Sequence, residues 1–262
     1  VRNEEGVVDT LATLNSMPIN DSTLVGKVIK QVVKALKGKL PANLKVHMLT
    51  GKVLPTALDN ADVIDSLSNG APGITYSTGN THTIGLVEGK ANKITFIHEL
   101  IHASTVSALQ GTSAEARKLN SNVSKLRSAA QTVYRNDTTV LTKLAKEQRD
   151  EVFNNAFKNN AEFVAMAMSE PAIIDFLATV PAPKLSAIDT GLISIFSAFI
   201  KSVSEFLGLT KNAKGKDVES VLSAMVNQTA QLMNINDQSS ASDQVNNYPG
   251  QQAAVDAVRL IR

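Results

Sequence analysis

The chain has 262 residues, of which 43% are hydrophobic and 19% are charged, enough for a sizeable core in one large or two small domains. The net charge of +2 and the aromatic content of 4% give no signal for specific nucleic-acid binding. The chain has no cysteine, which excludes disulfide bonds and thiolate metal sites within it. Any metal ion must therefore be held by histidine and carboxylate.

The first predicted elements are helices at residues 4–15 and 21–38. For the second helix, Asp21 or Ser22 is the expected N-cap. Its apolar residues recur at helical spacing, and its opposite face carries Lys27, Lys30, Lys34 and Lys37. We interpret these lysines as a solvated surface, because charge runs usually face water.

Strands and the central helix come next. Leu44–Leu49 is predicted to be a strand, 58–69 a short helix, and Gly73–Ser77 and His82–Val87 two strands joined by a turn. A helix over about 91–110 follows, and its sequence is apolar on most sides.

That helix contains the motif His98-Glu99-Leu100-Ile101-His102. Residues four apart lie on one face of a helix, so both imidazoles can point at one tetrahedral Zn²⁺. Glu99 points to the flank, where it can reach a water molecule without ligating the metal. The alternative interpretation is an ordinary core helix whose histidines are hydrogen-bonded.

The rest of the chain is predicted to be mainly helical. Helices are expected at about 113–135, 138–158, 161–168, 171–178, 186–207 and 217–233, with a short last helix at 253–261. The amphipathic helix 186–207 is expected to pack on the core, with membrane-surface or partner contact as the less favoured alternative. Residues 234–250 are rich in Asn, Gln and Ser and are expected to be mobile.

With this motif the sequence resembles a zincin metallopeptidase, and the gluzincin branch fits best. The metzincin continuation is missing, since Thr105 and Ala108 stand where its glycine and third histidine would be. The resemblance implies a third zinc ligand on a later helix, for which Glu162 is the best candidate because its neighbours are apolar. The alternative ligands are Asp150, Glu151, Glu170 and Asp175.

The resemblance also implies roles around the metal. Glu99 is the expected general base, and Tyr134 is a candidate donor to the oxyanion. The strand His82–Val87 is expected to line the cleft and to bind an extended peptide along its edge through Thr83 and Gly85, a plain sheet strand being the alternative. His82 is a weaker candidate for a donor that faces the substrate.

The expected fold is α+β and predominantly helical, with a small sheet before the motif helix and a helical C-terminal part. We expect a metallopeptidase-like domain at 1–180, packed helices at 181–233 and a polar tail at 234–262. The expected function is zinc-dependent hydrolysis of a peptide or protein substrate. The alternative is a catalytically silent domain that serves as a structural or ejected virion component.

The chain also resembles metallopeptidase-like domains in very large phage and mobile-element proteins. It starts at Val1 and shows no signal peptide and no apolar stretch of about 18 residues that could span a membrane. We therefore expect a piece of a larger protein or assembly, located in a virion or in the host cytoplasm.

Overall fold

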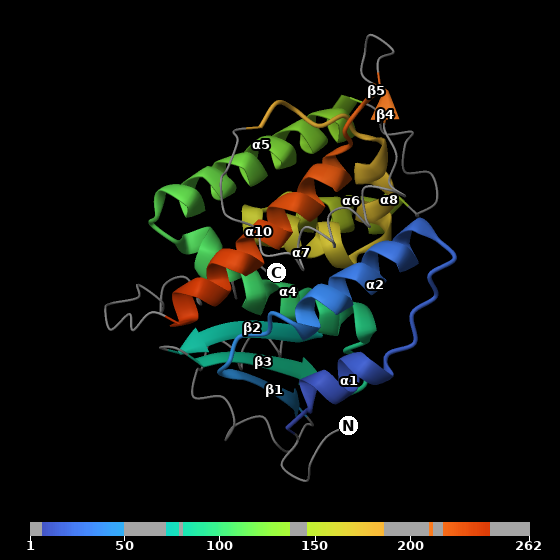
Figure 1. Ribbon diagram of the computed structural model, residues 1–262. Coiled ribbons are helices and arrows are strands. Elements are labelled where there is room, and N and C mark those ends of the chain that lie inside the picture. The colour runs from blue at the N-terminus through green and yellow to red at the C-terminus, as the bar shows by residue number, and fades with distance from the viewer. Residues whose placement is uncertain are drawn as a thin grey trace.

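The computed structural model describes residues 7–49, 72–78, 81–136, 146–185, 210–211 and 217–241. Its described part is predominantly helical with a small three-stranded sheet, which confirms the predicted fold class. Figure 1 shows the sheet at one end of the molecule, with helix α4 (Lys93–Gln110) between the sheet and the helices α7 (Asn160–Ser169) and α10 (Val221–Ala241). None of the described helices is long and apolar enough to cross a membrane.

The sheet contains β1 (Leu44–Leu49), β2 (Gly73–Thr78) and β3 (Thr81–Val87) in the order β1-β3-β2. β3 pairs in parallel with β1 and antiparallel with β2, so both of its edges carry ladder hydrogen bonds. The prediction that Thr83 and Gly85 offer a free strand edge to a peptide is therefore wrong. Central position also buries His82, which is 8% exposed and does not face solvent. The edge strand beside α4 is β2.

The N-terminal helices α1 (Thr10–Ser16) and α2 (Leu24–Lys37) flank the core. The N-cap of α2 is Thr23, whose Oγ1 accepts from the N–H of Gly26 at 3.1 Å, and not Asp21 or Ser22 as predicted. The carboxylate of Asp21 instead pairs with Lys30 across the first turns of the helix. Asp21, Ser22 and Thr23 are all residue types that can cap the N-terminus of a helix. The carboxylate of Asp21 is engaged in the ion pair with Lys30.

The remaining helices build one core on the far side of α4. They are α5 (Ala114–Asn136), α6 (Lys146–Ala156), α7, α8 (Pro171–Thr179) and α10, with a two-stranded ribbon of β4 (Thr210–Lys211) and β5 (Asp217–Val218) before α10. Phe153, Phe163 and Phe176 are among the largest fully buried side chains of this core. Helix α4 is buried on most sides, as predicted, because it packs on the sheet with one face and on α7 and α10 with others.

Two boundaries differ from the predictions at the C-terminal end. Residues 217–218 form β5, so the last described helix begins only at Val221. That helix then continues to Ala241, eight residues into the segment that was expected to be mobile from residue 234. The predicted helices at 58–69, 186–207 and 253–261, the start of the one at 138–158, and the rest of the polar tail lie outside the described residues.

Candidate metal centre

The centre of the site is on α4, where His98 and His102 lie one turn apart. The N-cap of this helix is Asn92, whose Oδ1 accepts from the N–H groups of Ile94 and Thr95. It is long because its apolar residues are buried against the sheet on one side and the helical core on the other. Both imidazoles therefore start from a rigid, buried backbone, and their Nε2 atoms are 3.0 Å apart.

The third group is Glu162, from the first turn of α7. Its two oxygens each face one imidazole: Oε2 is 3.4 Å from His98 Nε2, and Oε1 is 3.4 Å from His102 Nε2. The Oδ1 of Asn159, the N-cap of α7, accepts from the backbone N–H of Glu162 at 2.9 Å and so anchors the backbone of Glu162. The structure thus brings together the three residues that the sequence predicted as ligands.

A zinc ion requires a definite spacing between its ligand atoms. Bonds of about 2.0–2.1 Å in tetrahedral directions place neighbouring ligand atoms about 3.3 Å apart. The two Nε2 atoms are 3.0 Å apart, and each lies 3.4 Å from a different oxygen of Glu162, so each of these contacts is close to that value. Two imidazole nitrogens and one carboxylate oxygen are also ligands that Zn²⁺ accepts. The residues present therefore fit a zinc ion in donor type, and one possible ligand atom from each lies within 4.8 Å of the others.

The charges in the site explain why such a group can be buried. Burial alone would raise the pKa of Glu162, but the two imidazoles outweigh it and hold that pKa well below its usual range. Burial likewise opposes the charge on His102, yet the Glu162 carboxylate more than offsets this and raises the pKa of His102. A buried carboxylate needs a positive partner, which is either a proton on the imidazoles or a cation between them.

Glu99 lies beside this group and is not one of its members. Its side chain is turned toward β2, where the Thr75 hydroxyl lies 2.6 Å from Oε2 and 3.1 Å from the backbone oxygen of Glu99. Gly73 permits this close approach, because a Cβ there would lie 2.9 Å from Thr95 Cγ2 and 3.2 Å from Glu99 Cγ. Glu99 is buried, and the sheet holds its carboxylate through Thr75.

Tyr134 lies elsewhere, in an aromatic cluster of α5, α6 and α8. Its ring stacks on Phe153 with centroids 4.3 Å apart, and its hydroxyl donates to Asp150 Oδ1 at 3.0 Å. Burial and the hydrogen bond to Asp150 raise the pKa of Tyr134. These contacts account for the Tyr134 hydroxyl without any role in the metal centre.

Two residues in contact with the site were missed by the sequence predictions. Thr75 is 24 positions before Glu99, and only the sheet order shows that β2 faces α4. Ser169 lies at the end of α7, with Oγ 3.4 Å from His98 Nδ1. One signal was present for Ser169, since it stands seven residues after Glu162 and hence on the same stripe of that helix.

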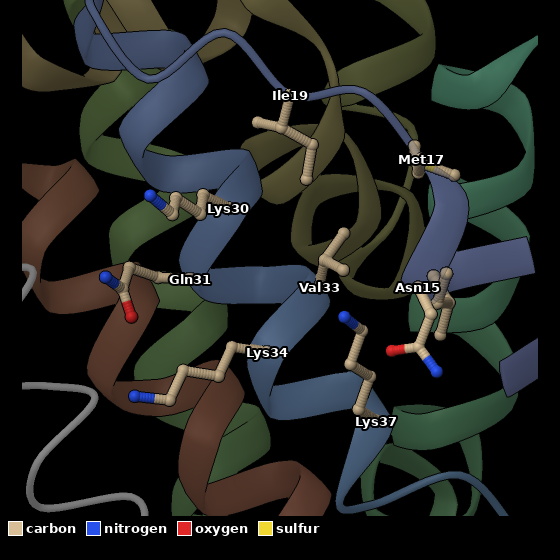
Figure 2. Close-up of a pocket in the computed structure, with 9 residues that line it drawn as sticks. Asn15, Met17, Ile19, Lys30, Gln31, Val33, Lys34 and Lys37 are labelled. Carbon is tan, nitrogen blue, oxygen red and sulfur yellow. The ribbon is translucent and has the colours of Figure 1, made fainter. Parts of the chain in front are cut away.

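A separate cavity of about 420 Å³ lies between α1 and α2 and shares no residue with the metal centre. Figure 2 shows that Lys30, Gln31 and Lys34 extend on the side of α2 opposite to Asn15 and Met17. Lys27, Lys30, Lys34 and Lys37 are all exposed, in agreement with their interpretation as a solvated surface.

No protein-family model matches the chain, and neither does any curated protein or solved structure with which it was compared.

Proposed function

We propose that this protein is a zinc-dependent peptidase of the zincin type, with His98, His102 and Glu162 as the metal ligands. The observation that supports this most directly is the convergence of three possible ligand residues: the two Nε2 atoms are 3.0 Å apart, and each lies 3.4 Å from a different oxygen of Glu162. A catalytic zinc has three protein ligands and one open position, whereas a structural zinc has four protein ligands. Within the described residues no fourth His, Asp or Glu joins this group, which favours the catalytic alternative.

When bound, zinc supplies Lewis-acid polarisation of the scissile carbonyl. Glu99 is the general base. With Oε2 bonded to Thr75, Oε1 is the oxygen that accepts a proton from the attacking water and returns it to the leaving amine.

The proposed substrate is a peptide in extended conformation. Because β3 is paired on both sides, the edge that remains next to α4 is that of β2, with Thr75 at its middle. No described strand pairs with the other edge of β2. A peptide that adds to this edge by backbone hydrogen bonds would pass Glu99 and the metal ligands. The larger phage or mobile-element protein suggested by the resemblance remains a prediction.

The test combines metal content with activity. Purified wild-type protein should contain about one zinc per chain by elemental analysis, as a single three-ligand site requires. Glu99→Gln keeps the shape of the side chain and removes the base, so zinc should stay bound while hydrolysis of a fluorogenic peptide library falls about 10²–10⁴-fold. The matched control is Glu115→Gln, an exposed change in the first turn of α5, which should alter neither value.

Three outcomes would contradict this proposal or part of it. Zinc-free wild-type protein would remove its basis. Loss of zinc in Glu99→Gln would make Glu99 a ligand and exclude its role as the base. Zinc-loaded protein that hydrolyses no peptide in either form would support the silent structural domain instead.

A further inference from the structure

Ser169 is the last residue of α7 and is 1% exposed. Its hydroxyl makes two contacts. Oγ donates to the backbone oxygen of Ala165 at 2.8 Å, one turn earlier on the same helix, and it lies 3.4 Å from Nδ1 of His98 on α4. The helix that supplies Glu162 to one nitrogen of His98 thus also supplies a hydroxyl to the other nitrogen.

The direction of the second contact follows from a count of protons. A serine hydroxyl has one proton, and the shorter contact to Ala165 uses it. Toward His98, Oγ can therefore only accept, which requires a proton on Nδ1. A neutral imidazole with its proton on Nδ1 has its lone pair on Nε2. That nitrogen is the one that faces His102 and Glu162.

We propose that Ser169 is a positioning residue that fixes His98 in the Nδ1–H form and aims its Nε2 lone pair at the metal. Groups that hold the second nitrogen of a metal-binding histidine fix its tautomer and ring orientation, and their loss costs about 10–100-fold in metal affinity. A hydroxyl does this without adding negative charge. The inference rests on the metal site of the proposed function, though not on peptide hydrolysis.

The first measurement is zinc affinity by competition with a chromophoric chelator. Ser169→Ala should weaken zinc binding by about 10–100-fold, and Ser169→Thr, which keeps a hydroxyl, should recover most of that loss. The matched control is Ser104→Ala on α4, which also removes a fully buried serine hydroxyl, but one with no hydrogen-bond partner. We expect the control to bind zinc like wild type. Equal affinity in Ser169→Ala and wild type would overturn the proposal.

The deciding part of the second measurement is made on wild-type protein and can be read with or without metal. Long-range ¹H–¹⁵N spectra of histidine-labelled wild-type protein, recorded with and without zinc, report which nitrogen of His98 carries the proton. We expect an Nδ1–H signal that exchanges slowly, and faster exchange in Ser169→Ala, with the His102 signal as internal reference. An Nε2–H form of His98 in the metal-free protein would overturn the proposal. Wild-type protein that shows the Nδ1–H form but binds no zinc would refute the proposed function and leave the Ser169 contact in place.

Discussion

Helices α2 and α4 both carry charged or ionisable residues at helical spacing, yet the structure treats them differently. On α2 the residues Lys27, Lys30, Lys34 and Lys37 share an exposed face, and the apolar residues of the helix face the core. On α4 the residues His98, Glu99 and His102 lie in a helix that is buried on most sides. Spacing on one helix therefore does not distinguish a site from a surface.

The difference lies in what the neighbouring elements contribute. Around α4, the α7 helix contributes Glu162 and Ser169, and β2 contributes Thr75, so each buried polar group of the motif meets a partner from another element. Around α2, Lys30 pairs only with the nearby Asp21, and both of these side chains are more than half exposed. Exposed pairs of this kind contribute little to stability, whereas a buried charge without a partner costs several kcal/mol.

The largest effect is expected from removing the ligand that α7 brings to α4. Glu162→Gln removes the carboxylate that balances the charge of the site. Loss of a residue that only hydrogen-bonds a metal ligand already costs about 10-fold in metal affinity, so the loss of a ligand should lower zinc affinity by at least about 10-fold. Glu151→Gln, an exposed change on α6, is the control and should bind zinc like wild type. If the control loses zinc and Glu162→Gln does not, the third ligand is misassigned.

The second-largest effect is expected from the hydrogen bond between Thr75 and Glu99, and it should change activity but not zinc binding. Thr75→Val removes the hydroxyl that bonds Glu99 but keeps the shape of the side chain. A net loss of about 1 kcal/mol in the positioning of the base would lower kcat/KM about five-fold, with zinc content unchanged. Thr132→Val on α5, where the hydroxyl is exposed and bonds only Ser128 of its own helix, should leave kcat/KM as it is. An equal loss in both variants would argue against a specific role for Thr75.

A smaller effect is expected where α7 begins. Asn159→Ala removes the N-cap that accepts from Glu162, which should cost about 1 kcal/mol of stability. For a chain of this size that lowers Tm by about 2–4 °C, which thermal unfolding followed by circular dichroism can measure. Asn159→Asp retains a capping oxygen and should recover the loss. A Tm for Asn159→Ala equal to that of wild type would show that the cap does not hold this helix end.

The smallest effect is expected on α2. Lys34→Gln removes one charge from the exposed lysine face, and a surface change away from special features should shift Tm by no more than about 2 °C. Zinc content and peptide hydrolysis should not change. A marked loss of either property would show that this face is more than solvated surface and would end the contrast between the two helices.

The cluster of His98, His102 and Glu162 could be predicted from sequence because its signal is local. His98 and His102 are one turn apart, and Glu162 is a single acid in an otherwise apolar helical run. The helices and strands around them follow from hydrophobic periodicity for the same reason, and Leu44–Leu49 has the bounds that were predicted.

What could not be predicted depends on contacts between distant segments. Periodicity predicts that residues 82–87 form a strand, but the pairing with β1, which made β3 central and β2 the edge, is set by the packing of the whole sheet. The contacts of Thr75 and Ser169 depend on how β2 and α7 are rotated against α4, which no local pattern encodes. The sequence suggests Tyr134 as the oxyanion donor only because of its position along the chain. The aromatic cluster that holds its ring joins distant segments, so no local pattern predicts it either.

The placement of the ligands on α4 and α7 also has a consequence for the chain as a polymer. About 60 residues separate His102 from Glu162, so an ion held by both would close a long loop, as a disulfide does in other proteins. In the chain-entropy description, closing a loop of that length in the unfolded chain raises the free energy of unfolding by about 4 kcal/mol. In a chain without cysteine, a metal crosslink would tie the two halves of the core together, and a chelator would loosen the fold as well as stop the chemistry.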